Sequence, residues 1–344
     1  ISPKDLAESM LMTARTLVEK EPNYSYVTAR LLLNNLENEV SSFLGFERSA
    51  DRAAMYKEAL VKTIDKGIEV GFLSEELKTF DLERLGSAIK EERDFQFTYL
   101  GLQTLYDRYF VTFEETRYEM PQVFLMRVAM GLAIQEKDKN DRAEEFYNLL
   151  SSFDYMSSTP TLFNSGTNRP QLSSCYLTTV PDDLSGIYGA IRDNALLSKW
   201  AGGLGNDWTN VRALGSRIKG TNGKSQGIVP FLKVSNDTAV AVNQGGKRKG
   251  AFCAYLECWH LDVEEFLDLR KNTGDDRRRT HDMNTANWVP DLFMKRLESD
   301  SNWTLFSPSD VPELHDIYGS EFEKRYEEYE KMAASGELKL YKII

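Results

Sequence analysis

Cysteine and histidine are scarce in this chain of 344 residues, which contains three of each. Three cysteines cannot close a disulfide framework, so the sequence indicates a reducing compartment, and we expect the cytoplasm. His260, His281 and His315 are too far apart in the chain for the usual spacing of metal ligands, and we expect no metal site.

Long apolar runs and excess positive charge are also lacking. No apolar stretch approaches the roughly 18 residues that a membrane-spanning helix needs, and no signal peptide is recognisable. The formal net charge of −11 argues against a general surface for nucleic acids or anionic membranes, although a local basic pocket for one phosphate group remains compatible with it. We therefore expect neither a membrane nor a nucleic acid among the partners.

Apolar residues at helical spacing dominate the first half of the sequence. Ser2 can cap a first helix, Pro3 suits its first position, and Asp5 can complete a capping box. The periodicity then predicts further helices over about residues 25–44, 52–69, 74–90, 94–109, 121–136 and 141–151. We expect an α-helical domain without catalytic residues of its own.

The composition changes near residue 157, where small hydroxyl residues and glycine-rich loops replace the charged helices. Besides the run that contains Cys175, strands are predicted over 206–211, 251–257, 285–289 and 303–306. Helices are predicted over 184–200, 230–242, 261–270, 291–298 and 320–332, and residues 215–227 are predicted to form a polar loop. This alternation predicts a mainly parallel sheet with helical crossovers, an α/β fold.

A thiol beside hydroxyl groups marks the middle of the chain. The hydroxyls of Thr159 and Ser174, next to backbone amides, are suitable phosphate ligands, and Cys175 could do redox or nucleophilic chemistry on a bound ligand. The alternative is that Cys175 is a small buried hydrophobic residue. Cys253 and Cys258 are five residues apart, so they would face opposite sides of a strand, and we interpret both as structural.

Two glycine-rich loops carry clustered cations. One contains Arg212 and Lys219, and the other contains Arg248 with a lysine on each side. In an acidic protein these clusters favour a local anion site, and a solvated cationic face is the alternative. Asp182 and Asp183 could accept hydrogen bonds from ribose hydroxyls or cap the following helix, and the two roles are compatible.

Six motifs, taken together and in order, resemble the large (α) subunit of class I ribonucleotide reductase. They are Gln171-Leu-Ser-Ser-Cys-Tyr-Leu, Ala201-Gly-Gly-Leu-Gly, Val211-Arg-Ala-Leu-Gly-Ser-Arg, Gln244-Gly-Gly-Lys-Arg-Lys-Gly-Ala, Trp259-His-Leu-Asp and Asp291-Leu-Phe-Met-Lys-Arg. The resemblance covers essentially the whole chain. It implies a remnant of an ATP-cone-like helical region over 1–40, an N-terminal helical domain over 41–168, and the first half of a ten-stranded α/β barrel over 169–344.

The resemblance implies radical reduction of ribonucleoside diphosphates to deoxyribonucleoside diphosphates, with two cysteines ending as a disulfide. Cys175 corresponds to the first cysteine of that redox pair, Thr159 and Ser174 to ligands of the substrate diphosphate, and Gly203 to a backbone position that lines the substrate. The remaining catalytic cysteines are expected in the C-terminal half of the α subunit. Other implied partners are a radical-generating β subunit, which supplies the radical cofactor, and thioredoxin or glutaredoxin. No covalently bound cofactor is expected.

The resemblance also implies allosteric control by a deoxynucleoside triphosphate or ATP, bound where two copies of the chain form a homodimer. The residues that correspond to effector contacts are Asp182, Asp183, Leu184, Lys199, Arg212, Ile218, Lys219 and Gly220. Asn243, Gln244 and Arg248 correspond to the loop that couples the effector to the substrate. Pro3 and Asn38 stand where relatives with an overall-activity site have nucleotide contacts, so no such site is expected.

Other functional interpretations stay open at this point. The chain could be a nucleotide-binding or regulatory module without catalysis, or one half of a split reductase that needs its C-terminal partner. The cobalamin-dependent class of the same fold is a further alternative, although the long helical region favours class I.

Overall fold

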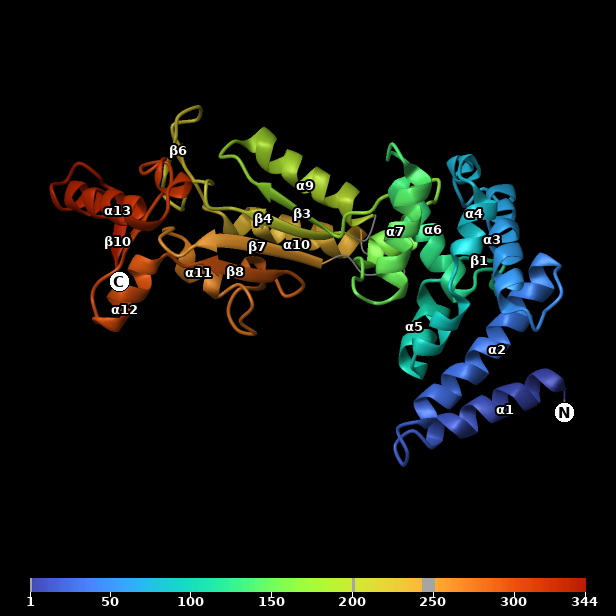
Figure 1. The fold of residues 1–344 in the computed structure, drawn as a ribbon. Helices are drawn as coiled ribbons and strands as arrows, with labels where there is room; N and C mark the ends of the chain where they lie inside the picture. Colours follow the sequence, from blue (N-terminus) through green and yellow to red (C-terminus); the bar gives the residue numbers. More distant parts are fainter. Residues whose placement is uncertain (1, 200–201, 243–250) are drawn as a thin grey trace. The chain divides into compact units, whose positions relative to one another are not determined.

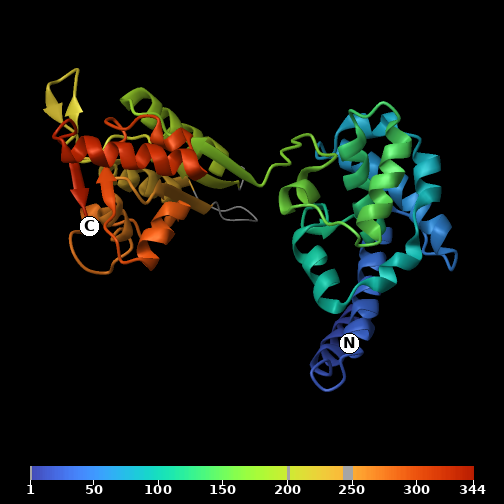
Figure 2. The same cartoon turned by 60° about the vertical axis from the view of Figure 1, so that its left-hand side comes forward.

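A computed structural model describes residues 2–199, 202–242 and 251–344. The chain divides into two compact units, one up to Ser174 and one from Cys175 onward (Figures 1 and 2). This division falls a few residues after the boundary expected at residue 168. The finer division near residue 40 stays a prediction.

The first unit is built from helices, as predicted. They are α1 (Pro3–Thr16), α2 (Tyr24–Leu44), α3 (Arg52–Glu69), α4 (Leu82–Ala88), α5 (Tyr99–Arg108), α6 (Pro121–Ala133), α7 (Lys139–Ser151) and α8 (Thr159–Asn164), with 3₁₀ helices η1 (Glu75–Thr79) and η2 (Glu91–Gln96). A short hairpin joins β1 (Thr112–Phe113) to β2 (Thr116–Arg117). The predicted capping box of α1 is confirmed, since Ser2 and Asp5 exchange both hydrogen bonds.

Two predicted helices of this unit are wrong in their extent. Residues 74–90 do not form one helix, because Asp81 accepts a hydrogen bond from the Arg84 amide and so begins α4 as a new helix. Phe80, just before it, is buried in extended backbone. The helix expected from residue 94 begins only at Tyr99.

A buried ion pair fixes the end of the first unit that carries Thr159. Arg127 of α6 and Glu119 are both fully buried, with Arg127 Nε 2.7 Å from Glu119 Oε1. Arg127 also donates to the carbonyl oxygens of Ser165, at 2.5 Å, and of Leu162. The guanidinium thereby holds the end of α8 against α6 with charge-assisted bonds.

In the described part of the second unit, four parallel strands form a sheet in the order β3-β4-β7-β8. They are β3 (Cys175–Thr179), β4 (Gly203–Asp207), β7 (Ala251–Glu257) and β8 (Asn284–Trp288). The helices are α9 (Leu184–Ser198), α10 (Val229–Val242), α11 (Val263–Leu267), α12 (Asp291–Glu298) and α13 (Gly319–Ala334), with 3₁₀ helices η3 (Asp276–Arg278) and η4 (Leu314–Asp316). The predicted parallel sheet with helical crossovers is confirmed.

Two smaller pairs of strands complete the unit. One is β9 (Thr304–Phe306) with β10 (Tyr341–Ile343), and the other is the hairpin β5 (Arg217–Ile218) and β6 (Gly223–Lys224). The prediction of a polar loop over 215–227 did not include this hairpin. The strand predicted over 206–211 is also wrong, because β4 begins at Gly203 and ends at Asp207.

The two faces of the parallel sheet differ. Leu204, Phe252 and Leu256 on one face are buried with residues of α9 and α10, which pack along it (Figure 1). Alternate residues point to the other face, where Leu177 is 82% exposed. Within the described ranges, no helix is long and apolar enough to cross a membrane.

Candidate functional site

The predicted redox thiol lies at the amino end of the sheet. Cys175 is the first residue of β3, is exposed, and is a thiol rather than part of a disulfide. In register with it stands Gly203 of β4, followed by Ala251 of β7. Because glycine has no side chain, none projects from β4 at the position next to Cys175.

The predicted diphosphate ligands belong to the first unit. Thr159 is the first residue of α8, and its hydroxyl oxygen lies 3.1 Å from the phenol oxygen of Tyr109. Ser174 is half-buried directly before β3. The grouping of these residues with Cys175 and Gly203 around one diphosphate stays a prediction.

The other two cysteines differ from each other. Cys258 is buried beyond the end of β7, and burial raises the pKa of its thiol to about 12, which suits an unreactive structural role. Cys253 of β7 instead lies on the same face of the sheet as Cys175 of β3. Cys175 is in register with Gly203 and Ala251, and Cys253 is two residues after Ala251 on the same strand. The structural role expected for Cys253 stays a prediction; its thiol is half-buried, and burial raises its pKa.

Two of the predicted effector ligands contact each other. Arg212 Nε lies 2.9 Å from Asp182 Oδ2, and the Arg212 amide donates to Asp182 Oδ1 at 3.0 Å. This hydrogen bonding raises the pKa of the Arg212 guanidinium. Arg212 Nη1 also donates to the carbonyl oxygen of Arg217 at the start of the hairpin. Asp183 caps α9 by accepting from the Gly186 amide at 2.8 Å, as predicted.

The other predicted effector residues are divided between the two ends of α9 and the hairpin β5–β6. Leu184 is 63% exposed at the first turn of α9, while Lys199 follows its last turn. A helix of this length spans about 22 Å, so α9 separates the two. Ile218 lies in β5, with Lys219 and Gly220 exposed beyond it. Asn243, Gln244 and Arg248 of the predicted coupling loop lie outside the described residues.

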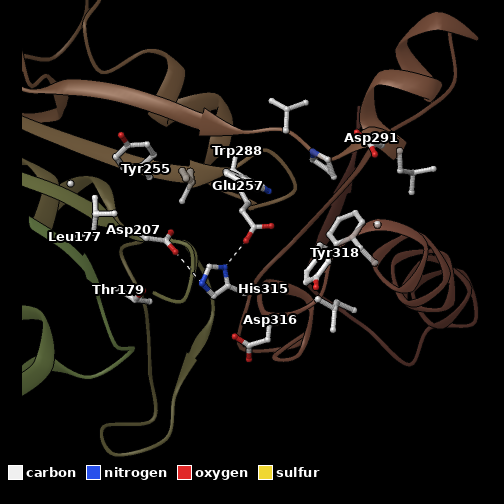
Figure 3. Close-up of a pocket in the computed structure, with 18 of the residues that line it drawn as sticks. Leu177, Thr179, Asp207, Tyr255, Glu257, Trp288, Asp291, His315, Asp316 and Tyr318 are labelled. Carbon is white, nitrogen blue, oxygen red and sulfur yellow. Dashed lines mark hydrogen bonds and ion pairs between the residues drawn. The ribbon is translucent and has the colours of Figure 1, made fainter. Parts of the chain in front are cut away.

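A pocket of about 770 Å³, which the sequence did not predict, lies at the carboxyl ends of the strands (Figure 3). Asp207 ends β4, Glu257 ends β7, and His315 reaches both from the segment after β9. His315 Nε2 is 3.0 Å from Asp207 Oδ2, and its Nδ1 contacts a carboxylate oxygen of Glu257. Trp288 and Tyr318 line the same pocket.

The electrostatics of this cluster favour a charged histidine. The hydrogen bonds with Asp207 and Glu257 raise the pKa of His315 to about 10. Burial raises the pKa of Asp207, but its bonds with His315 and Thr209 outweigh burial, and the net change is a decrease. Burial raises the pKa of Glu257. At neutral pH an imidazolium therefore joins two carboxylates and ties the segment before α13 to the sheet.

The part of the chain that the structure describes contains no group of three or more His, Cys, Asp or Glu side chains that could hold a metal ion.

Comparison with known proteins identifies the family. Residues 173–343 match the family "Ribonucleotide reductase, barrel domain", and residues 95–170 match "Ribonucleotide reductase, all-alpha domain". The chain is 58% identical, over its whole length, to the ribonucleoside-diphosphate reductase subunit alpha of Chlamydia muridarum, of which it covers 33%. It is 48% identical to the corresponding Helicobacter pylori subunit, with 96% of the chain and 41% of that protein covered.

The similarity extends to eukaryotes. The chain is 42% identical to the ribonucleoside-diphosphate reductase large subunit of Arabidopsis thaliana, with 96% of the chain and 40% of that protein covered. The chain thus spans between about a third and two fifths of the length of these relatives. A mainly helical unit followed by a unit with a parallel sheet and helical crossovers agrees with the order of the two matched domains. The chain belongs to the ribonucleotide reductase large-subunit family, of which it carries the all-α domain and part of the barrel domain.

Proposed function

We propose that the full-length protein containing this chain reduces ribonucleoside diphosphates to deoxyribonucleoside diphosphates. The observation that carries the proposal is the exposed Cys175 thiol at the first residue of β3, in register with Gly203, which has no side chain. In the reaction the 2′-hydroxyl leaves as water and hydrogen replaces it. Cys175 and a second cysteine outside this chain supply the two electrons and both protons, and end as a disulfide. Thioredoxin or glutaredoxin then reduces the disulfide.

The hydroxyls of Thr159 and Ser174 would bind the substrate diphosphate, and a β subunit would supply the radical that starts the reaction. Specificity control by a nucleoside triphosphate would use Asp182 and Arg212. Since α9 separates Leu184 from Lys199, an effector site between two copies of the chain, in a homodimer, would allow both residues to contribute. The cytoplasm, with its thioredoxin and glutaredoxin, is the compartment that fits this chemistry.

The test is Cys175→Ser in the full-length protein, combined with its β subunit and assayed for CDP reduction driven by thioredoxin. We expect thioredoxin-driven turnover to be lost, because serine cannot form the disulfide. Cys253→Ser is the matched control, on the same face of the sheet, and should keep turnover within about twofold, since it removes one half-buried sulfur atom.

Retained thioredoxin-driven turnover in the Cys175→Ser protein would refute the redox role. A full-length protein that binds dTTP but reduces no diphosphate, even with an active β subunit, would favour the regulatory alternative instead.

A further inference from the structure

One buried carboxylate ties together the two ends of the segment 214–228. Asp262 Oδ1 accepts a hydrogen bond from the Leu214 amide at 2.9 Å, and Oδ2 accepts one from the Ile228 amide at 3.0 Å. Asp262 stands directly before α11, where an aspartate ordinarily caps its own helix, yet it makes no capping bond there. Asp262 is only 4% exposed, and each of its two side-chain oxygens accepts one amide of the segment.

His260, two residues before Asp262, holds Val211, which directly precedes Arg212. The Asp262 amide donates to His260 Nδ1 at 3.0 Å, so His260 Nε2 carries the proton and donates to the Val211 carbonyl oxygen at 2.8 Å. His260 is fully buried, and burial lowers its pKa, which keeps the imidazole neutral in this role.

A third anchor comes from the end of β9. Ser307 Oγ accepts from the Ala213 amide at 3.2 Å and lies 2.7 Å from Ser216 Oγ. Gly227 has a φ of +75°, and a Cβ atom there would lie 2.3 Å from Asp262 Oδ2, so glycine is required for the carboxylate to approach. Beyond these anchors the hairpin β5–β6 projects from the unit (Figures 1 and 2).

Arg212 is therefore flanked by backbone groups that distant side chains hold: the Val211 carbonyl on one side and the Ala213 and Leu214 amides on the other. Its own side chain reaches Asp182 and the first residue of the hairpin. The position of this guanidinium thus depends on Asp262 and His260, some 50 residues later in the chain.

We infer that Asp262, supported by His260, is a positioning residue for the triphosphate effector. It holds the base of the segment 211–228 so that Arg212 and the hairpin face the effector in one geometry. This inference rests on the proposed function, because the effector role of Arg212 belongs to that proposal.

The experiment compares Asp262→Asn and Asp262→Ala with Asp268→Asn in the full-length protein. Asp268 is a partly exposed aspartate six residues further on, paired with Lys271, and serves as the matched control. Dissociation constants for dTTP are measured by equilibrium dialysis, and amide hydrogen exchange is followed without nucleotide.

We expect exchange to accelerate within residues 211–228 and the Kd for dTTP to rise about tenfold in the Ala protein, since two charge-assisted hydrogen bonds are lost. The Asn protein should fall between Ala and wild type, because its single side-chain oxygen serves one of the two amides. The control should match wild type in both measurements.

Unchanged exchange in 211–228, or an unchanged Kd for dTTP, would overturn the inference. Exchange that accelerates throughout residues 175–344 would overturn it as well, in favour of a general folding role. If the wild-type protein binds no dTTP, the effector proposal fails and the positioning role falls with it. Even then, if the Asp262 variants left amide exchange in residues 211–228 unchanged, Asp262 would be shown not to hold the segment.

Discussion

Replacing His315 by glutamine should destabilise the second unit by an amount that depends on pH. In the wild-type protein, His315 lies between Asp207 and Glu257 and is 19% exposed. Glutamine can keep one hydrogen bond but carries no charge, so the two carboxylates would face each other without a cation. The loss should be largest below pH 6.5, where the wild-type histidine is charged in both states, and should shrink as the pH rises through the range where only the folded state keeps the proton.

The magnitude follows from the pKa of His315. A rise from 6.5 to about 10 corresponds to at most about 5 kcal/mol of stabilisation. Because the side chain is partly exposed, solvent screens the pair, and we expect about 2–3 kcal/mol. Since the pKa is raised in the folded state, this stabilisation is fully present below pH 6.5 and is lost as the pH rises towards 10.

The assay is urea unfolding of the full-length wild-type and variant proteins, followed by tryptophan fluorescence. All five tryptophans of this chain lie in its second unit, and tryptophans elsewhere in the protein are replaced by phenylalanine. The difference in unfolding free energy should be about 2–3 kcal/mol at pH 6.5 and below about 1 kcal/mol near pH 9.5. His281→Gln, at an exposed histidine, is the control and should show no such trend. A difference that stays constant or grows between these pH values would refute the reasoning.

Two further predictions concern buried and paired charges. Arg127→Met should cost about 3–5 kcal/mol in thermal unfolding, because it leaves Glu119 buried without a cation, and adding Glu119→Gln should recover part of the loss. A single change without effect would contradict this. Asp182→Asn should raise the Kd for dTTP about tenfold by equilibrium dialysis, because Arg212 loses its charged partner. Asp193→Asn, exposed on α9, is its control, and equal Kd values for the two proteins would contradict the prediction.

Local signals in the sequence predicted the elements that depend on neighbouring residues alone. The capping box of Ser2 and Asp5 and the cap at Asp183 involve partners three residues apart, and both are present. The alternation of strand and helix likewise predicted the parallel sheet, because a parallel connection requires a crossover.

Two local signals were present but not used. Asn222 ends the four-residue loop between β5 and β6 with a φ of +54°, in the left-handed region that asparagine tolerates better than most residues. Asp81 is a helix-capping residue in the middle of the predicted helix 74–90, and it begins α4. Asn222 therefore indicates a turn within 215–227, and Asp81 indicates a break in the predicted helix 74–90.

The charged cluster at the carboxyl ends of the strands could not be predicted in the same way. His315 meets Asp207 and Glu257 only because β4, β7 and the segment after β9 converge there, and 58 residues separate even the nearer pair. No spacing rule connects residues so far apart. Parallel strands place polar residues at a shared edge, but a single sequence does not show which later segment returns to it.

The same reasoning changes what the motif Trp259-His-Leu-Asp indicates. From the sequence alone, this motif was one of six points of family resemblance, with no visible link to the basic, glycine-rich segment around Arg212. In the structure its histidine and aspartate hold the backbone on both sides of Arg212. A cation in a glycine-rich loop recognises an anion well only if its position is restrained, since a mobile arginine loses side-chain and backbone entropy on binding. The residues that restrain it are therefore as much part of the anion-site hypothesis as the cation itself, and they lie in a different part of the sequence.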